Sequence, residues 1–221
     1  MLAQKEQNHE EALEYFKKAF KVKTHENCAD LFHAAKSALA LEKNSLAKRY
    51  IINAIKYTAP KRSYYDNFFS SYKNKQPIID ISNEFDNYKQ FHYENFIPKS
   101  VYDELDELIK RDQSVRLEDE LSIDKMKEVD NYNMNRLIKL TQTYGWLDRG
   151  WLLLWHQRSG YGYNNHFWKY FKPLIDGEIK SGKVEKGFWA SFEDNLHLQN
   201  KGKQKYGTYS NIEIDDVQNV D

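Results

Sequence analysis

The sequence predicts a mainly α-helical protein, in which helical hairpin repeats are followed by a helical domain closed by a two-stranded antiparallel β-hairpin. Three observations lead to this fold. All nine glycines lie between Gly145 and Gly207, so the first 144 residues lack the residue that most easily makes tight turns. Small and aromatic residues recur at a helical-repeat distance near the N-terminus. From Phe188 onward, the even positions are apolar apart from one and the odd positions are mostly polar, which is the period of a strand.

The composition excludes several classes of protein. The 221 residues include 33 basic and 33 acidic residues, a balance that provides no electrostatic footprint for nucleic acid or an anionic membrane. No apolar run approaches the roughly 20 residues that span a bilayer, and the N-terminal residues lack the layout of a signal peptide. The single cysteine, Cys28, excludes a disulfide framework and a cysteine-rich zinc site. We therefore expect a cytoplasmic protein without metal or cofactor.

Residues 1–58 contain an internal repeat at a distance of 35 positions. Its members are Ala12, Tyr15 and Ala19, which recur as Ala47, Tyr50 and Ala54. Helix pairs with small residues at fixed points and a period near 34 resemble the tetratricopeptide repeat. We expect helices at about 8–22, 27–42 and 45–58. Such repeats need three or more units to form a binding groove, so these helices are expected to support the rest of the chain, with a partner-binding groove as the second interpretation.

Residues 59–99 form an aromatic-rich segment between Pro60 and Pro98. We interpret it as a helical connector whose aromatic side chains pack against its neighbours. Base stacking on these rings would require an accompanying basic groove, and the mixed charges of the segment do not supply one.

The C-terminal domain is expected at residues 100–210, followed by an acidic tail at 211–221. Ser100 is a suitable N-cap for its first helix. The next helix is expected from about Ser122 to Tyr144, where Gly145 ends it. Residues 150–157 are apolar almost all round and predict a buried helix, and residues 164–180 predict another.

The last element is expected to be a β-hairpin at residues 188–209. The even positions from Phe188 to Leu198 are apolar apart from Asp194. Residues 200–202, Asn-Lys-Gly, suit a three-residue loop with glycine in the left-handed conformation. This register would place Asp194, Gln204 and Thr208 on one face beside the core.

Polar residues stand at core positions in three separate elements. Asn133 interrupts an apolar stripe of the long helix, with Asp130 on its flank. His156 lies in the apolar helix, and Asp194 interrupts the apolar face of its predicted strand. Because burying a polar group without a hydrogen bond costs a few kcal/mol, we expect these groups to share a pocket whose charge is balanced by Arg111 or Arg116.

A series of short motifs runs through the same region. It comprises Arg111-Asp112-Gln113 with Arg116, then Asp130, Asn133 and Leu137, Gly145-Trp146, Trp155-His156, Asp194-Asn195, and Gln204 with Tyr206-Gly207-Thr208-Tyr209. In order and spacing it resembles the bacterial domain-of-unknown-function family 6624 over roughly residues 100–210. The resemblance implies a fold but no activity. Trp155, Asn195 and Tyr209 depart from the family pattern, which suggests a divergent member.

Three functions fit these observations. The first is a ligand- or peptide-binding module without nucleic-acid or membrane partners. Its candidate binding residues are Asp112, Gln113, Arg116, Asp130, Asn133, Trp146, Gln204, Tyr206 and Thr208. The second is an enzyme with His156 as general base, oriented by Asp194 or Asp112. The third is a protein that binds or neutralises a protein partner through the repeat helices and the aromatic connector.

Overall fold

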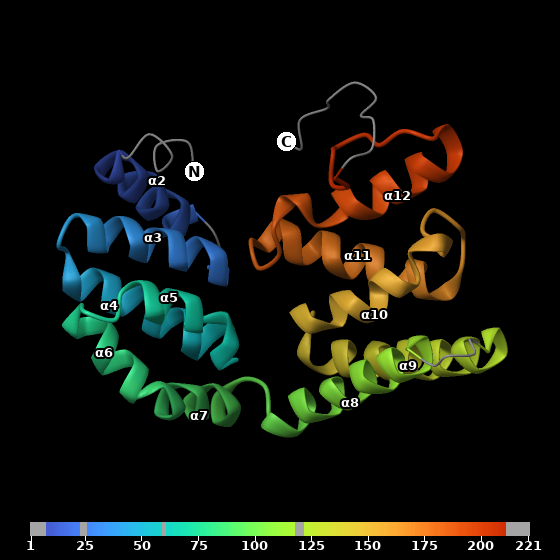
Figure 1. Cartoon of the computed structure of the whole chain (residues 1–221), viewed down its shortest axis with the longest axis horizontal. Helices are drawn as coiled ribbons and strands as arrows, with labels where there is room; N and C mark the ends of the chain where they lie inside the picture. Colours follow the sequence, from blue (N-terminus) through green and yellow to red (C-terminus); the bar gives the residue numbers. More distant parts are fainter. Residues whose placement is uncertain (1–7, 23–25, 59–60, 118–121, 211–221) are drawn as a thin grey trace. The chain divides into compact units, whose positions relative to one another are not determined.

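The computed structural model describes residues 8–22, 26–58, 61–117 and 122–210, and Figure 1 shows their arrangement in each half of the chain. The described residues form eleven α-helices and no strand, so the predicted mainly α class is correct and the predicted β-hairpin is wrong. The chain divides into two compact units, residues 1–98 with 181–183 and residues 99–180 with 184–221. The expected acidic tail at 211–221 lies outside the described residues.

The N-terminal unit is a series of short helices (Figure 1). Their bounds are α2 His9–Val22, α3 Cys28–Ala40, α4 Asn44–Asn53 continued by a π-helical turn Ala54–Thr58, a 3-10 turn Arg62–Tyr64, α5 Asp66–Ser71, α6 Gln76–Asn83 and α7 Phe85–Asn95. The three helices expected in residues 8–58 are confirmed. Asn27 caps α3, because its Oδ1 accepts a hydrogen bond of 2.8 Å from the backbone N–H of Asp30.

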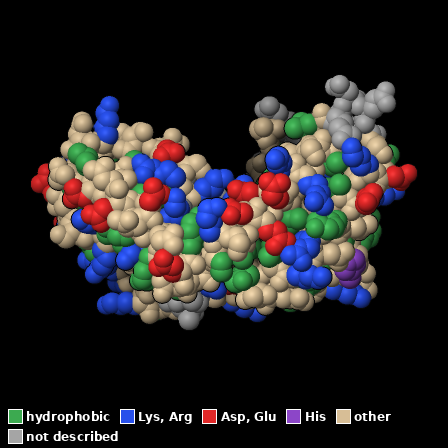
Figure 2. Space-filling model, turned by 90° about the horizontal axis from the view of Figure 1, so that it is seen from below, with side chains coloured by type: hydrophobic (Ala, Val, Ile, Leu, Met, Phe, Trp, Pro, Cys, Tyr) green, Lys and Arg blue, Asp and Glu red, His purple; other side chains and the backbone are tan. Residues whose placement is uncertain are grey.

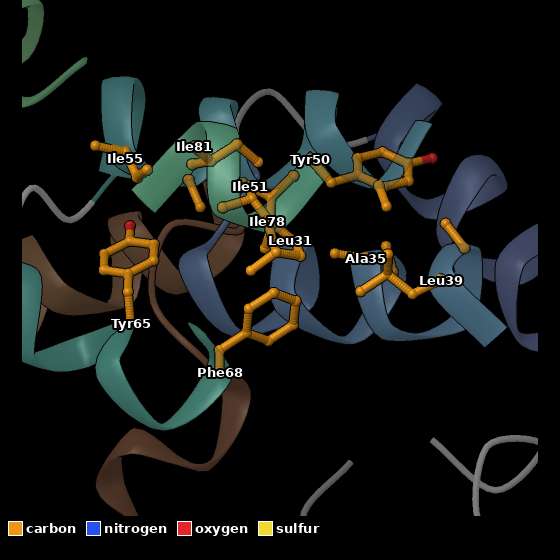
Figure 3. Packing of buried hydrophobic residues seen from close by; sticks show 14 of the residues in the cluster. Leu31, Ala35, Leu39, Tyr50, Ile51, Ile55, Tyr65, Phe68, Ile78 and Ile81 are labelled. Carbon is orange, nitrogen blue, oxygen red and sulfur yellow. The ribbon is translucent and has the colours of Figure 1, made fainter. Parts of the chain in front are cut away.

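One apolar core holds the N-terminal unit together (Figure 3). Buried alanines on α3 and α4 let these helices approach closely, while aromatic residues of the predicted connector, such as Tyr65 and Phe68, pack into the same core. The repeat positions are not equivalent in environment, since Tyr50 is 4% exposed and Tyr15 is 56% exposed. The tetratricopeptide-like character of these helices therefore stays a prediction.

The C-terminal unit contains the longest helices of the chain. Its elements are α8 Lys99–Arg116, α9 Ile123–Tyr144, a 3-10 turn Asp148–Gly150, α10 Trp151–His156, a 3-10 turn Arg158–Gly160, α11 His166–Ser181, a 3-10 turn Lys186–Trp189 and α12 Ala190–Lys201. As expected, Ser122 caps α9, whose end is at Gly145, where φ is +76°. The expected buried helix and the helix after it correspond to α10 and α11.

Residues 188–201 fold as a 3-10 turn and α12 instead of a strand. The alternating pattern misled the prediction because residues four apart, such as Phe188 and Phe192, lie on one face of a helix as well as on one face of a strand. Both rings are buried in this unit, and they lie 5.9 Å apart between centroids. Gly202 does adopt the expected left-handed conformation, with φ +70°, but it ends a helix, and its N–H donates to Leu198 O at 2.9 Å.

The surface of the described residues carries both signs of charge. Figure 2 shows Lys and Arg side chains interspersed with Asp and Glu side chains on the visible face, as the balanced composition predicts. Within the described ranges, no helix combines the length and apolar character needed to cross a membrane.

Replacing Gly202 with alanine tests the C-terminal cap of α12. Because an L-residue with a Cβ is strained at φ +70°, we expect Gly202→Ala to lower the free energy of unfolding by about 1 kcal/mol. Gly187→Ala is the matched control, since a Cβ there meets no atom within 4 Å. Urea denaturation followed by circular dichroism measures both variants, and equal stabilities would contradict the assignment of the cap.

Candidate functional site

A buried carboxylate and a histidine meet between α8 and α10. The Nδ1 atom of His156 lies 2.6 Å from Oδ2 of Asp112. An ionised carboxylate has no hydrogen to donate, so Nδ1–H of His156 donates and the carboxylate accepts. In the neutral imidazole, the other ring nitrogen, Nε2, then carries a free lone pair.

Arg116 links the same carboxylate to α9. Its Nη1 lies 3.3 Å from Oδ1 of Asp112, and its Nη2 donates to Oδ1 of Asp130 at 2.7 Å. Gln113 Nε2 donates to Oδ2 of Asp112 at 2.8 Å. We call these five residues, Asp112, Gln113, Arg116, Asp130 and His156, the Asp112 cluster. The cluster contains two carboxylates and one guanidinium, so a proton accepted by His156 would balance its charge.

The i, i+4 spacing of Asp112 and Arg116 places both side chains on one face of α8. The predicted charge partner was Arg111 or Arg116, and Arg116 is the one paired with Asp112. Arg111 instead lies over the ring of Tyr132, 4.4 Å from its centroid. The ion pair between Arg116 and Asp130 brings together two motifs that are separate in the sequence, one on α8 and the other on α9.

Asn133 lies one helical turn from the cluster and is 1% exposed. Its Nδ2 donates to the backbone O of Leu108 at 3.0 Å, which connects α9 to α8. Its Oδ1 has no hydrogen-bond partner among the described residues. Asn133 therefore holds a neighbouring backbone, as expected of a buried amide, while one acceptor stays unsatisfied.

Asp194 organises a different part of the unit, the loop that follows α12. We call residues 202–210 the closing loop. The buried Oδ1 of Asp194 accepts hydrogen bonds of 2.6 Å from the N–H groups of Lys205 and Tyr206. Its Oδ2 accepts from the N–H and Oγ1 of Thr208 at 2.8 and 2.7 Å. Asp194 and Thr208 are thus neighbours, as predicted, although no hairpin joins them.

Four hydrogen-bond donors determine the direction in which the pKa of Asp194 is shifted. Burial by itself raises the pKa of this carboxyl group, but the hydrogen bonds from Thr208, Tyr206 and Lys205 outweigh it and leave the pKa below its ordinary value. These bonds use the acceptor positions of the carboxylate. Of the two carboxylates predicted to orient His156, Asp112 is therefore the one that is hydrogen-bonded to it.

The remaining predicted binding residues also have internal roles. Gln204 is buried and forms two hydrogen bonds of 2.8 Å with the backbone of Tyr209. Tyr206 OH donates to Glu193 at 2.8 Å. The ring of Trp146 packs edge-on against Phe188, with centroids 5.5 Å apart. These three residues stabilise the closing loop and the aromatic core.

Tyr209 contacts both Asn195 and Trp155. Asn195 Nδ2 donates to the hydroxyl group of Tyr209 at 3.3 Å, and the ring of Tyr209 lies 6.2 Å from that of Trp155. A change at one of these positions alters the surroundings of the others.

Two further polar groups were not singled out in the sequence. Trp168 is 2% exposed, and its Nε1 has no hydrogen-bond partner within the described part of the chain. Asn165 caps α11, because its Oδ1 accepts from the backbone N–H of Trp168 at 3.0 Å. The position of Asn165 just before an amphipathic helix is a detectable cap signal, whereas nothing in a sequence marks an unpaired indole.

Comparison with known proteins adds no identification, because no family model, curated protein or solved structure matches the chain. Over the residues that the structure describes, no group of three or more His, Cys, Asp or Glu side chains could hold a metal ion.

Replacing Asp194 with asparagine tests the role of this residue in the closing loop. The amide presents an NH₂ group to donors that now face a carboxylate, so we expect Asp194→Asn to lower the free energy of unfolding by about 3 kcal/mol. Glu107→Gln, at an exposed position of α8, is the control and should change stability by less than about 0.5 kcal/mol. Thermal and urea unfolding measure both, and an unchanged stability would refute this structural role.

A comparison of wild type with Asp194→Asn also tests the lowered pKa of Asp194. A carboxyl group whose pKa is lower when folded stabilises the protein above its unfolded pKa of about 3.9, and this stabilisation is lost as the pH falls towards the folded pKa. We therefore expect the stability difference between wild type and Asp194→Asn to be constant from pH 7 to about 5 and to shrink below about pH 4. A difference that grows on acidification would have the wrong sign.

Proposed function

We propose that the C-terminal unit catalyses proton transfer, with His156 as general base and Asp112 as the residue that orients it. The supporting observation is the 2.6 Å contact between His156 Nδ1 and Asp112 Oδ2. This hydrogen bond selects the tautomer that leaves Nε2 free to accept a proton, and it stabilises the imidazolium that forms.

The burial of the two side chains supports the same roles. The side chain of Asp112 is 2% exposed, whereas that of His156 is 17% exposed. The orienting carboxylate is shielded from water, which strengthens its hydrogen bond, while part of the His156 side chain reaches the surface. Arg116 binds the other oxygen of this carboxylate, Oδ1, and is itself paired with Asp130.

The hydrogen-bond partners of His156 indicate which kind of reaction to propose. Among the described hydrogen bonds, none joins His156 to a serine, threonine or cysteine that could act as a nucleophile. The proton removed by Nε2 would then come from water or from the substrate itself. We propose hydrolysis of a small ester or amide by water that His156 activates.

The family resemblance supports a shared site. Asp112, Gln113, Arg116, Asp130 and His156 all belong to its motifs, and they are 44 residues apart at the extremes.

A second candidate function is recognition of a small molecule or peptide. It is favoured by the buried Oδ1 of Asn133, an unsatisfied acceptor one turn from the cluster. Mass spectrometry of the protein as purified would reveal a retained ligand. Under this function, His156→Gln would weaken binding without any catalytic turnover in the wild type.

Hydrolysis of p-nitrophenyl acetate tests the proposed function without knowledge of the natural substrate. We expect wild-type protein to exceed the rate of an equal concentration of free imidazole, and His156→Gln and Asp112→Asn each to lose at least about tenfold of that rate. His166→Gln, at an exposed histidine that starts α11, is the matched control and should keep the wild-type rate. Melting temperatures show whether each variant is folded.

An NMR measurement distinguishes a loss of the His156 tautomer preference from a loss of the folded structure. In ¹⁵N spectra of the imidazole rings at alkaline pH, His156 should carry its proton on Nδ1 in wild type and lose this preference in Asp112→Asn. A wild-type rate equal to that of imidazole, or a His156→Gln variant with full activity, would rule out the general-base proposal.

A further inference from the structure

The rotation of the Asp112 carboxylate about its last side-chain torsion decides which oxygen faces His156. This torsion is broad and roughly two-fold in aspartate, so rotamer preference by itself does not fix the plane of the carboxylate. Hydrogen bonds must fix it. Besides His156, two described side chains donate to this carboxylate, Gln113 and Arg116, and both stand on α8, the helix of Asp112 itself.

Arg116 holds the carboxylate loosely. Its Nη1 lies 3.3 Å from Oδ1 of Asp112, whereas its Nη2 lies 2.7 Å from Oδ1 of Asp130. The guanidinium therefore binds Asp130 more closely than Asp112. A distance of 3.3 Å is beyond the usual range of an N–H···O hydrogen bond, and one such contact leaves the other oxygen of Asp112 free to turn.

Gln113 makes a closer contact with that other oxygen. Its Nε2 lies 2.8 Å from Oδ2 of Asp112, the same atom that Nδ1 of His156 approaches to 2.6 Å. An ionised carboxylate can only accept hydrogen bonds, so the NH₂ group of the amide faces it and the amide oxygen does not. The contacts from Gln113 and Arg116 thus hold the two oxygens of the carboxylate at two separate points.

The position of Gln113 in α8 indicates that this bond serves the carboxylate more than the helix. Residues i and i+1 of a helix do not face each other, so a bond between positions 112 and 113 is not one of the pairs that stabilise helices. Among the described residues, it is the one hydrogen bond of the Gln113 side chain, and it joins α8 to no second element.

We infer that Gln113 is a positioning residue for His156 and that it acts through Asp112. Its N–H fixes Oδ2 in the orientation in which Nδ1–H of His156 meets an acceptor, and Nε2 of the imidazole then keeps its lone pair. The effect on the reaction rate rests on the proposed function of His156, whereas the effect on the imidazole tautomer does not.

A competing role for Gln113 is solvation of the buried charge. In that role any donor that reaches Oδ2 is sufficient, so water would replace a deleted amide and His156 would keep its tautomer. In the positioning role water is a poor substitute, because it is not tethered to α8 and does not fix the plane of the carboxylate. The tautomer of His156 therefore distinguishes the two roles.

¹⁵N spectra of the histidine rings at alkaline pH test the inference in the full-length protein. The chain has seven histidines, and His156→Gln identifies the signals of His156. Gln113→Met removes the donor at nearly constant side-chain length. We expect it to lower the ratio of the Nδ1–H to the Nε2–H tautomer at least threefold and to slow p-nitrophenyl acetate hydrolysis by a similar factor. Gln142→Met, at an exposed glutamine of α9, is the matched control and should keep both wild-type values.

A rescue variant shows whether the donor itself matters. Gln113→Lys keeps an N–H donor at this position and should retain most of the wild-type tautomer ratio. A wild-type ratio in Gln113→Met, or equal losses in Gln113→Met and Gln113→Lys, would overturn the inference and leave the general-base proposal standing. If the wild-type rate does not exceed that of imidazole, the proposed function fails, and the tautomer ratios still decide the role of Gln113. Melting temperatures show whether each variant is folded, and Gln113→Ala, with the best helix former, repeats the deletion if Gln113→Met unfolds.

Discussion

The C-terminal unit depends on one constraint, the burial of the Asp112 carboxylate. An ionised carboxylate removed from water is strongly destabilising unless charged and hydrogen-bonding partners surround it. Asp112 obtains them from its own helix through Gln113 and Arg116, and from α10 through His156. Arg116 extends the network to Asp130 on α9. Three helices must therefore keep their mutual positions if this one carboxylate is to stay satisfied.

Other polar contacts between α8 and the elements that follow it reinforce this geometry nearer to the surface. Arg136 Nε donates to Glu104 at 2.7 Å, and Arg149 pairs with Asp106. Their side chains are more exposed than that of Asp112, so water and salt screen these pairs more strongly. The surface pairs support the alignment of the helices, but the penalty for misalignment is larger at the buried carboxylate.

A second, apolar centre lies at the buried ring of Phe192 on α12. Six aromatic rings have centroids between 5.3 and 6.4 Å from it, namely Trp151, Trp155, Tyr161, Phe188, Trp168 and Trp189. Asp194, two residues further along α12, fastens the closing loop by four hydrogen bonds. One face of α12 thus packs in the aromatic core through Phe192, and the Asp194 side chain of the same helix binds the closing loop.

The sequence alone determined the features that arise within a few residues of the chain. Helix bounds near Asn27, Ser122 and Gly145 were predictable because caps and breakers act locally. The inward polar residues were identifiable because a polar group in an apolar stripe must be satisfied. Only the tertiary structure decided between strand and helix at residues 188–201, since alternating apolar residues suit both and the surrounding aromatic rings favour the helix. It also decided that Asp112 pairs with His156 while Asp194 binds the closing loop, because hydrogen bonds depend on distances between elements far apart in the chain.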